Sequence, residues 1–180
     1  MKYKIILMLN YFSLFLLDCI VGHIPCWVLR KSLYRLAGMK IGRGSRILMG
    51  ARIQGPKGIS IGDHSYINSG CHLDGRGGLR IGNNVNISNY TVIVTASHDM
   101  KSSAFQYREG EVVIEDYCWI GTRAIVLDNS VLSMGSVLSA GSVYKGQGKP
   151  YGVYVGVPAQ YVKDRDLQGE YDVDWRPFFV

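Results

Sequence analysis

An aliphatic residue returns at about every sixth position along most of this chain. These positions are Ile41, Ile47, Ile53, Ile61, Ile67, Leu73, Ile81, Ile87, Ile93, Ile114, Ile120, Val126, Leu132 and Leu138. Four positions after most of them stands a small or short residue, as at Ser45, Ala51, Ser65, Cys71, Gly77, Val85, Thr91, Ser97, Cys118, Ala124, Ser130, Ser136 and Ser142. A period of six fits neither a helix nor plain alternation, but it fits short strands that each end in a bend. We therefore predict that both series point inward in a parallel β-solenoid over residues 41–163.

The spacing of equivalent aliphatic residues indicates how many sides each coil has. Ile114 and Leu132 are 18 residues apart, which is three sides of six. Ile41, Ile61 and Ile81 are 20 apart, which adds a two-residue bulge at the third corner. The spacing predicts about five triangular coils, the last one incomplete, in an all-β domain roughly 20–25 Å long.

One coil is interrupted by a long insertion. Ile81 and Ile114 are 33 residues apart, so about fifteen extra residues lie near 99–113, directly after the sequence VTASH. Compact domains seldom carry such a loop without a function. His98, where the chain leaves the solenoid wall, is therefore the leading candidate for a catalytic residue.

An apolar segment precedes the repeat. Residues 5–21 contain fourteen apolar residues in seventeen, with lysines before them and basic residues after them. This length is short for a bilayer span, and Asn10, Ser13 and Asp18 interrupt it. Three arrangements of this helix stay open: it lies on a membrane or on a neighbouring subunit, it packs on its own domain, or it spans a bilayer.

A second helix is predicted after Pro25, which ends the first. Residues 27–38 place four apolar residues on one face and the basic residues elsewhere, and Gly38 is a plausible stop. The apolar positions are Val28, Leu29, Leu33 and Leu36, and the basic ones are Arg30, Lys31 and Arg35.

Composition and charge narrow the class of protein. The 180 residues, 47% of them hydrophobic and 22 of them glycine, fit one packed globular domain. The net charge of +6 is concentrated in residues 1–46, with eight Lys or Arg and one Asp, so a membrane headgroup or another anionic ligand suits the chain better than nucleic acid. Four cysteines without metal-type spacing favour a reduced, cytoplasmic protein. We expect it in the cytoplasm, at the inner face of the cell membrane if the first helix binds lipid.

The hexads IGDHSY, IGNNVN and IGTRAI, with the segment VLSAGSVYKGQGKPYGVYVGVPAQYV, resemble the hexapeptide-repeat acyltransferases. The resemblance covers about residues 41–163 and is greatest to the maltose/galactoside and the colanic-acid and capsule-type sugar O-acetyltransferases. It implies a left-handed parallel β-helix, whereas the general rule for parallel crossovers favours the right hand. It also implies a homotrimer that uses acetyl-CoA and no metal.

The resemblance implies roles for individual residues. A histidine at the position of His98 is the general base of the sugar acetyltransferases, and an imidazole suits removal of a hydroxyl proton. Asn68, in SYIN, matches the asparagine that contacts the acceptor sugar. Thr122 and Ala140 match positions that line the coenzyme A groove, although they also fit plain outward loop positions.

Further matches concern coenzyme A. Trp119, in CWIG, matches the tryptophan beside the pantetheine arm, and it also fits a packing aromatic. Lys145, Gln160 and Lys163 fall where the family places groups for coenzyme A phosphates. Gln160 departs from the usual Lys or Arg, and Arg76 stands near an acceptor-binding aspartate of the galactoside enzymes, which indicates a different acceptor.

The position of each residue within its coil indicates how the site is assembled. Asn68, Thr122 and Ala140 lie 7 or 8 residues after the start of their coils, and His98 lies 17 residues after the start of its coil. About half a perimeter separates them, roughly 15–20 Å, which is too far to hold one reacting centre. We therefore expect a site shared between subunits, with His98 of one chain facing the other three positions of the next.

The resemblance, together with the positions of these residues, implies an acetyl-CoA-dependent O-acetyltransferase acting on a sugar of a capsule, exopolysaccharide or O-antigen, by direct transfer. Cys71 and Cys118 fall on inward positions and are excluded as nucleophiles. The alternatives are N-acetylation of an amino sugar, O-acetylation of a small metabolite, and a solenoid that only binds. A zinc hydratase of the same fold needs a second histidine soon after His98, and none follows. The tail, residues 164–180, is expected to pack through Tyr171, Trp175, Phe178 and Phe179.

Overall fold

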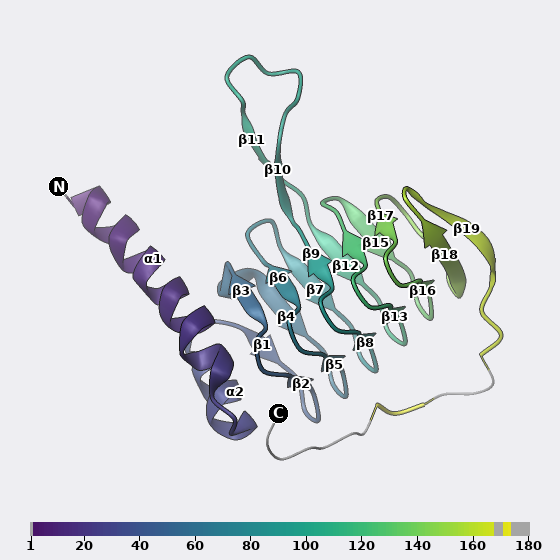
Figure 1. The fold of residues 1–180 in the computed structure, drawn as a ribbon, viewed down its shortest axis with the longest axis horizontal. Helices are drawn as coiled ribbons and strands as arrows, with labels where there is room; N and C mark the ends of the chain where they lie inside the picture. Colours follow the sequence, from purple (N-terminus) through teal and green to yellow (C-terminus); the bar gives the residue numbers. More distant parts are fainter. Residues whose placement is uncertain (1, 168–170, 174–180) are drawn as a thin grey trace.

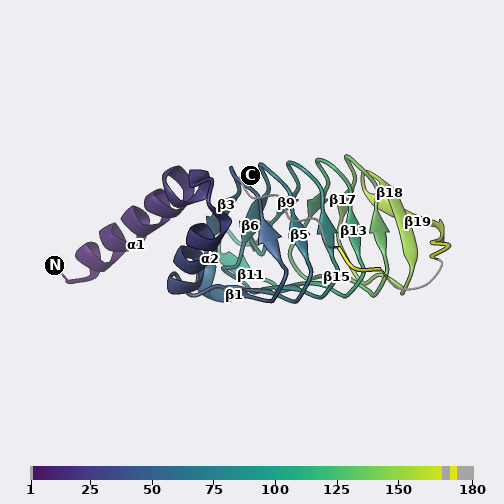
Figure 2. The ribbon, with the colours of Figure 1, turned by 90° about the horizontal axis from the view of Figure 1, so that it is seen from below.

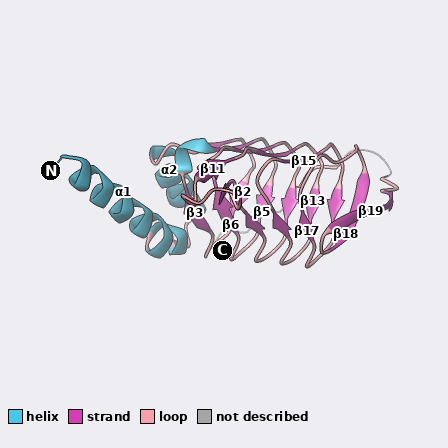
Figure 3. Cartoon of the chain, turned by 90° about the horizontal axis from the view of Figure 1, so that it is seen from above, coloured by secondary structure: helices cyan, strands magenta, loops and turns pink. Residues whose placement is uncertain are grey.

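A computed structural model describes residues 2–167 and 171–173. It is a triangular β-solenoid with two helices at its N-terminal end and a hairpin that projects from one corner (Figure 1). The coils stack along one axis, the second helix lies on the first coil, and the first helix extends away from the solenoid (Figure 2). Helices gather at one end and strands fill the rest of the molecule (Figure 3). Trp175, Phe178 and Phe179 lie outside the described residues.

Three parallel sheets form the sides of the triangle. The first side contains β1 (Lys40–Ile41), β4 (Ile59–Ile61), β7 (Leu79–Ile81), β12 (Val112–Ile114) and β15 (Ser130–Leu132). The second contains β2 (Arg46–Ile47), β5 (Tyr66–Ile67), β8 (Asn86–Ile87), β13 (Trp119–Ile120), β16 (Val137–Leu138), β18 (Gly152–Gly156) and the antiparallel β19 (Ala159–Asp164). The third contains β3 (Arg52–Gln54), β6 (His72–Asp74), β9 (Val92–Ile93), β14 (Ile125–Val126) and β17 (Val143–Tyr144). We call the turns after the first, second and third sides the first, second and third corners.

The strand register confirms the arithmetic of the repeat. Ile41 pairs with Ile61, Ile61 with Ile81, Ile81 with Ile114 and Ile114 with Leu132. All fourteen recurring aliphatic side chains are buried, at 4% exposure or less, and they form one continuous core. The small residues are buried too, except the half-buried Gly77 and Ser97. The bulge at the third corner of the first coil is a short 3-10 helix, η2 (Pro56–Gly58).

The predicted number of coils was too low. Five coils are complete, and a sixth begins with a bridge between Val131 and Gln147 and continues into β18. The chain then turns back as β19, which pairs antiparallel with β18 and covers the open edge of the second sheet. Sequence counting missed this coil because residues 145–156 lack the six-residue aliphatic period.

The insertion is a β-hairpin rather than an irregular loop. Strand β10 (Ala96–His98) pairs antiparallel with β11 (Tyr107–Glu109), and the hairpin projects from the third corner of the third coil (Figure 1). Val112 and Val113 already pair with the third and fifth coils, on β7 and β15. The predicted limits 99–113 were therefore shifted, since the extra residues begin before His98 and end before Val112.

The first helix, α1 (Lys2–Cys19), is joined to the solenoid through its last turn. Asp18 accepts a hydrogen bond from the Ile53 N–H at 2.8 Å and pairs with Arg52, and Leu17 is buried beside it. Met8, Tyr11, Phe12 and Phe15 are more than half exposed. No helix in the described part of the chain is long and apolar enough to cross a membrane. The last turn thus packs on its own domain, and a short 3-10 helix, η1 (Val21–His23), follows it.

The second helix, α2 (Trp27–Leu36), presents a different face from the predicted one. Its buried residues are Trp27, Arg30 and Tyr34, whereas Val28 and Leu36 are 73% and 84% exposed. The physical reason is the open edge of the first coil, whose carbonyl groups have no preceding strand. Three cations of the helix donate to these carbonyls: Arg30 to Ile47, Lys31 to Gly42 and Arg35 to Ile41. Gly38, at φ +108°, ends the helix as predicted.

Candidate functional site

His98 lies at the root of the hairpin, on the outer surface of the third corner. Its ring stacks on Phe105, with centroids 3.9 Å apart and planes 13° apart. Its other contact is the edge of Tyr107, at 5.8 Å and 69°. Tyr107 is the register partner of His98 across the hairpin, so strand pairing itself brings the two rings together. The imidazole is exposed and fixed between two aromatic rings, and it can accept a proton from a bound hydroxyl.

A buried carboxylate fixes the hairpin root from the coil below. Asp74 is fully buried and accepts two hydrogen bonds from the Arg76 guanidinium, at 2.9 and 3.0 Å. It also accepts the Thr95 N–H at 3.0 Å, just before the hairpin begins. Burial alone would raise the pKa of Asp74, but the hydrogen bonds from Arg76 and Thr95 outweigh it and lower the pKa. The Arg76 guanidinium also lies over the Tyr107 ring at 6.0 Å, which links this carboxylate to the partner of His98.

A second buried carboxylate fixes the root from the coil above. Asp128 is 5% exposed and accepts hydrogen bonds from Lys145 at 2.9 Å, Asn129 at 3.0 Å and Ser97 at 3.3 Å. Burial opposes the charge of Asp128, yet the hydrogen bond and the charge of Lys145 lower its pKa. Lys145 is predicted to contact a coenzyme A phosphate. It lies at the third corner, as His98 does, and its ammonium group is paired with the Asp128 carboxylate.

The positions predicted to stack on one line do so at the second corner. Thr122 and Ala140 are exposed and occupy equivalent places in successive coils, and the Gly141 N–H donates to the Thr122 carbonyl at 2.9 Å. Asn68 lies at the same corner two coils below Thr122, one residue earlier in register. Its amide group donates to the Ile87 carbonyl at 2.8 Å and to Asn86 at 3.1 Å. The whole third side separates this corner from His98, so one chain does not bring the four residues together.

The remaining predicted coenzyme A residues lie on the second side. Trp119 is 47% exposed on β13, and its indole N–H donates to the Ser88 hydroxyl at 3.2 Å. Gln160 and Lys163 are exposed on β19, at the far end of the same sheet. Lys163 makes no ion pair with a residue that the structure describes.

The other candidate chemistry is structural. The Cys71 and Cys118 thiols are buried and donate to backbone carbonyls, and burial raises their pKa to about 11 and about 12. Neither can serve as a thiolate nucleophile near neutral pH. Among the described residues no group of three or more His, Cys, Asp or Glu side chains is arranged to hold a metal ion.

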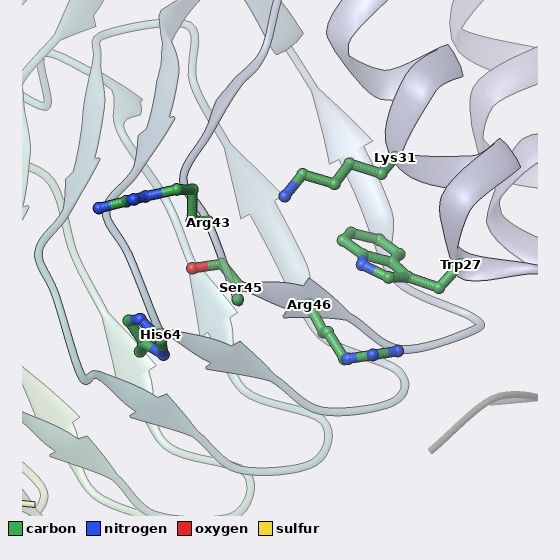
Figure 4. A pocket seen from close by; sticks show the side chains of 7 residues that line it. Trp27, Lys31, Arg43, Ser45, Arg46 and His64 are labelled. Carbon is green, nitrogen blue, oxygen red and sulfur yellow. The ribbon is translucent and has the colours of Figure 1, made fainter. Parts of the chain in front are cut away.

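A polar hollow of about 450 Å³ lies at the first corner, away from His98. Lys31 and Trp27 of α2 form one wall, and Arg46, Ser45 and His64 of the first two coils form another (Figure 4). The Lys31 ammonium lies 6.0 Å from the centre of the Trp27 ring. The hollow adds positive charge to the end of the molecule that carries α1.

Sequence reasoning missed the residues that hold His98. Phe105 and Tyr107 are set by the hairpin register, which the length of an insertion does not reveal. Asp74 and Asp128 carried a usable signal, because Asp74 comes directly after the inward Leu73 and Asp128 comes two positions after the inward Val126, one coil below and one coil above the insertion. An acid at such a place is costly to bury unless a cation compensates it.

No protein family model and no curated protein matches this sequence. Solved structures match it over most of its length. A hexapeptide-repeat-containing acetyltransferase from Vibrio cholerae O1 biovar eltor, complexed with acetyl coenzyme A, is 27% identical, with 87% of each chain covered and a TM-score of 0.80. A maltose O-acetyltransferase from Clostridium difficile 630 is 22% identical, with 84% of this chain and 83% of that chain covered and a TM-score of 0.78.

A third structure is a variant of AntD, an N-acyltransferase from Bacillus cereus, in complex with dTDP and coenzyme A. It is 23% identical, and the match covers 78% of this chain and 92% of that chain with a TM-score of 0.66. These structures confirm the fold class and the resemblance to the hexapeptide-repeat acyltransferases. The Vibrio cholerae structure also supports the prediction of an acyltransferase with a coenzyme A thioester as donor.

Proposed function

We propose that this protein is an acetyl-CoA-dependent O-acetyltransferase that modifies a sugar hydroxyl in the synthesis of a capsule, an exopolysaccharide or an O-antigen. One observation carries the proposal: an exposed histidine is fixed between two aromatic rings on a hexapeptide-repeat solenoid whose solved neighbours include acetyltransferases. A hydroxyl acceptor suits this site because a hydroxyl needs a base at the moment of attack.

The proposed reaction is a direct transfer within a ternary complex. His98 removes the proton of the acceptor hydroxyl while that oxygen attacks the thioester carbonyl carbon. A backbone N–H stabilises the oxyanion, the C–S bond then breaks, and His98 returns its proton to the sulfur of coenzyme A. No acyl-enzyme forms, which agrees with the burial and the raised pKa of the two inward cysteines.

The proposed site lies between two subunits of a homotrimer. His98, at the third corner of one chain, faces the second corner of its neighbour, where Asn68 contacts the acceptor sugar and Thr122 and Ala140 line the coenzyme A groove. The separation of these corners by a whole side of the solenoid supports this arrangement. The remaining proposed donor contacts are Trp119 beside the pantetheine arm and Lys145, Gln160 and Lys163 near the phosphates.

We also propose peripheral binding to the inner face of the cell membrane through residues 1–40. The exposed Phe12 and Phe15 on α1 and the cationic hollow beside α2 support it (Figure 4). Arg30, Lys31 and Arg35 donate hydrogen bonds to carbonyl groups of the first coil. The electrostatic attraction to anionic lipids should therefore be weaker than the charge of the sequence suggests. The protein should pellet with anionic vesicles and be released by salt. Resistance to salt and to alkaline extraction would contradict surface binding.

The function is tested by following free thiol release from acetyl-CoA in the presence of free sugars, nucleotide sugars and polysaccharide repeat units. We expect release with one hydroxyl acceptor and loss of release in His98→Ala. Faster turnover of amino sugars than of the matching sugars would favour N-acetylation, and a small metabolite as the only acceptor would favour the other alternative. No release with any acceptor, from a folded trimer that binds acetyl-CoA, would contradict the proposal.

A further inference from the structure

An apolar groove of about 950 Å³ separates the helices from the third corner. One wall consists of α1 and α2, through residues such as Leu14, Leu17, Leu33 and Leu36. The facing wall is the third corner of the first two coils, with Tyr107 of the hairpin beside it. Figure 1 shows α1 and the hairpin projecting to the same side of the solenoid. A volume of this size is in the range of pockets that enclose a small organic ligand.

The groove leads to the proposed catalytic base. Tyr107 lines it, and the centre of the Tyr107 ring is 5.8 Å from the centre of the His98 ring. Arg76 also lines the groove, and its guanidinium group lies over the Tyr107 ring, 6.0 Å from the ring centre. A ligand that fills the groove therefore ends one side chain away from His98 on the same chain.

The lining of the groove combines apolar side chains with a cation. The groove is continuous with exposed apolar residues of the helices, since Tyr11 is 65% and Leu36 is 84% exposed. Lys57, at the third corner of the first coil, also lines the groove and makes no ion pair with a residue that the structure describes. Its aliphatic stem lies against Gly38, where a Cβ would come within 2.6 Å of the Lys57 Cγ. The Arg76 charge is already balanced by Asp74, so Lys57 is the cation available to an anionic group there.

We propose that this groove holds the hydrocarbon chain of a lipid-linked acceptor, whose phosphate lies at Lys57 and whose sugar reaches His98. The proposal rests on the proposed function and names the class of its acceptor. An apolar chain with one anionic group matches the apolar walls and the Lys57 ammonium, and a free sugar or a nucleotide sugar would leave the walls exposed to water. Entry from the helices would let the lipid pass from the membrane surface into the groove.

Binding of alkyl phosphates tests the groove without reference to acetyl transfer. Calorimetry with butyl, octyl and decyl phosphate, all below their micelle concentrations, should show affinity rising roughly fourfold per methylene group. Leu36→Glu, in the groove, should abolish this rise. Leu29→Glu is the matched control, because Leu29 is half exposed on the same helix and does not line the groove. Lys57→Gln should weaken decyl phosphate about tenfold and leave decanol unchanged.

Three results would overturn the proposal. Affinity that does not depend on chain length would exclude the hydrocarbon site, including the case in which a second copy of the chain or the C-terminal tail fills the groove. Equal loss in Leu36→Glu and Leu29→Glu would assign the binding to the exposed helix surface. An unchanged preference for decyl phosphate over decanol in Lys57→Gln would exclude the phosphate position. Each result is independent of whether the protein releases thiol from acetyl-CoA, so failure of this proposal is distinguishable from failure of the proposed function.

Discussion

The second and third corners of the solenoid are built from the same repeat and differ in what they hold. At the second corner the coils repeat without interruption, and Thr122 and Ala140 occupy equivalent exposed positions. At the third corner a hairpin interrupts the third coil, and the coils on either side each bury one carboxylate, Asp74 and Asp128, paired with a cation. The regular stacking of coils at the second corner provides a surface along which a long ligand can lie. The buried ion pairs at the third corner fix His98 at the root of the hairpin, where the chain leaves the stack of coils. The donor and the base are accordingly proposed for different corners.

Removing the imidazole should have the largest effect. His98→Ala should lower turnover by roughly 10²–10⁴, the usual contribution of a general base, with little change in acetyl-CoA affinity. Steady-state kinetics and calorimetry measure the two quantities. His72→Ala, on the outer face of the third side, is the control and should retain activity. Near-normal turnover in His98→Ala would remove this residue from the mechanism.

Breaking the buried Asp74–Arg76 ion pair below the hairpin should have the second largest effect. Asp74→Ala leaves the Arg76 guanidinium and the Thr95 N–H without their acceptor, which should lower the free energy of unfolding by about 2–4 kcal/mol. Turnover should fall as the hairpin root loosens. The control is Asp63→Ala, which removes an ion pair with the largely exposed Arg43 at the first corner and should lower the free energy of unfolding much less. Equal destabilisation by the two variants would show that the third corner is not specially reinforced.

A bulky residue at the second corner should affect only the binding of acetyl-CoA. Ala140→Trp should raise the KM for acetyl-CoA by about tenfold or more, because the indole would occupy the proposed coenzyme A groove, while thermal stability stays unchanged. Met134→Trp, at an exposed position of the first corner in the same coil, is the matched control. If both variants bind acetyl-CoA like the wild type, the donor does not lie along the second corner.

The decrease in the free energy of unfolding at low pH that comes from the third corner should be the smallest effect. The folded-state pKa values of Asp74 and Asp128 are lowered, so their stabilisation is present above the unfolded pKa of about 4 and is lost as the pH falls through the folded values. The free energy of unfolding should therefore decrease below about pH 4. Asp74→Asn should show a shallower decrease in denaturant titrations between pH 2 and pH 7. An identical slope would mean that this carboxylate does not contribute.

The parts of the molecule that follow the repeat could be predicted from sequence, because inward aliphatic residues fix the register of every coil. The position of His98 and the stacking at the second corner followed from the same arithmetic. The other features depend on contacts between groups that are distant in sequence and meet only in the folded chain. The helical pattern predicts an outward Arg30, because its burial depends on carbonyl groups of the first coil that only the folded edge presents. Phe105 and Tyr107 likewise meet His98 only through the hairpin register.

Subunit complementation tests the central claim, a site shared between chains, most directly. His98→Ala and Asn68→Ala chains, each inactive alone, are unfolded together, refolded at equal concentration and assayed as trimers, with subunit exchange verified by mass. Random assembly should restore about one quarter of wild-type activity, because one interface in four joins an intact His98 to an intact Asn68. Co-assembly of His98→Ala with a chain carrying both substitutions should stay inactive. Verified mixed trimers with no recovered activity would contradict the shared site and the assignment of donor and base to different corners.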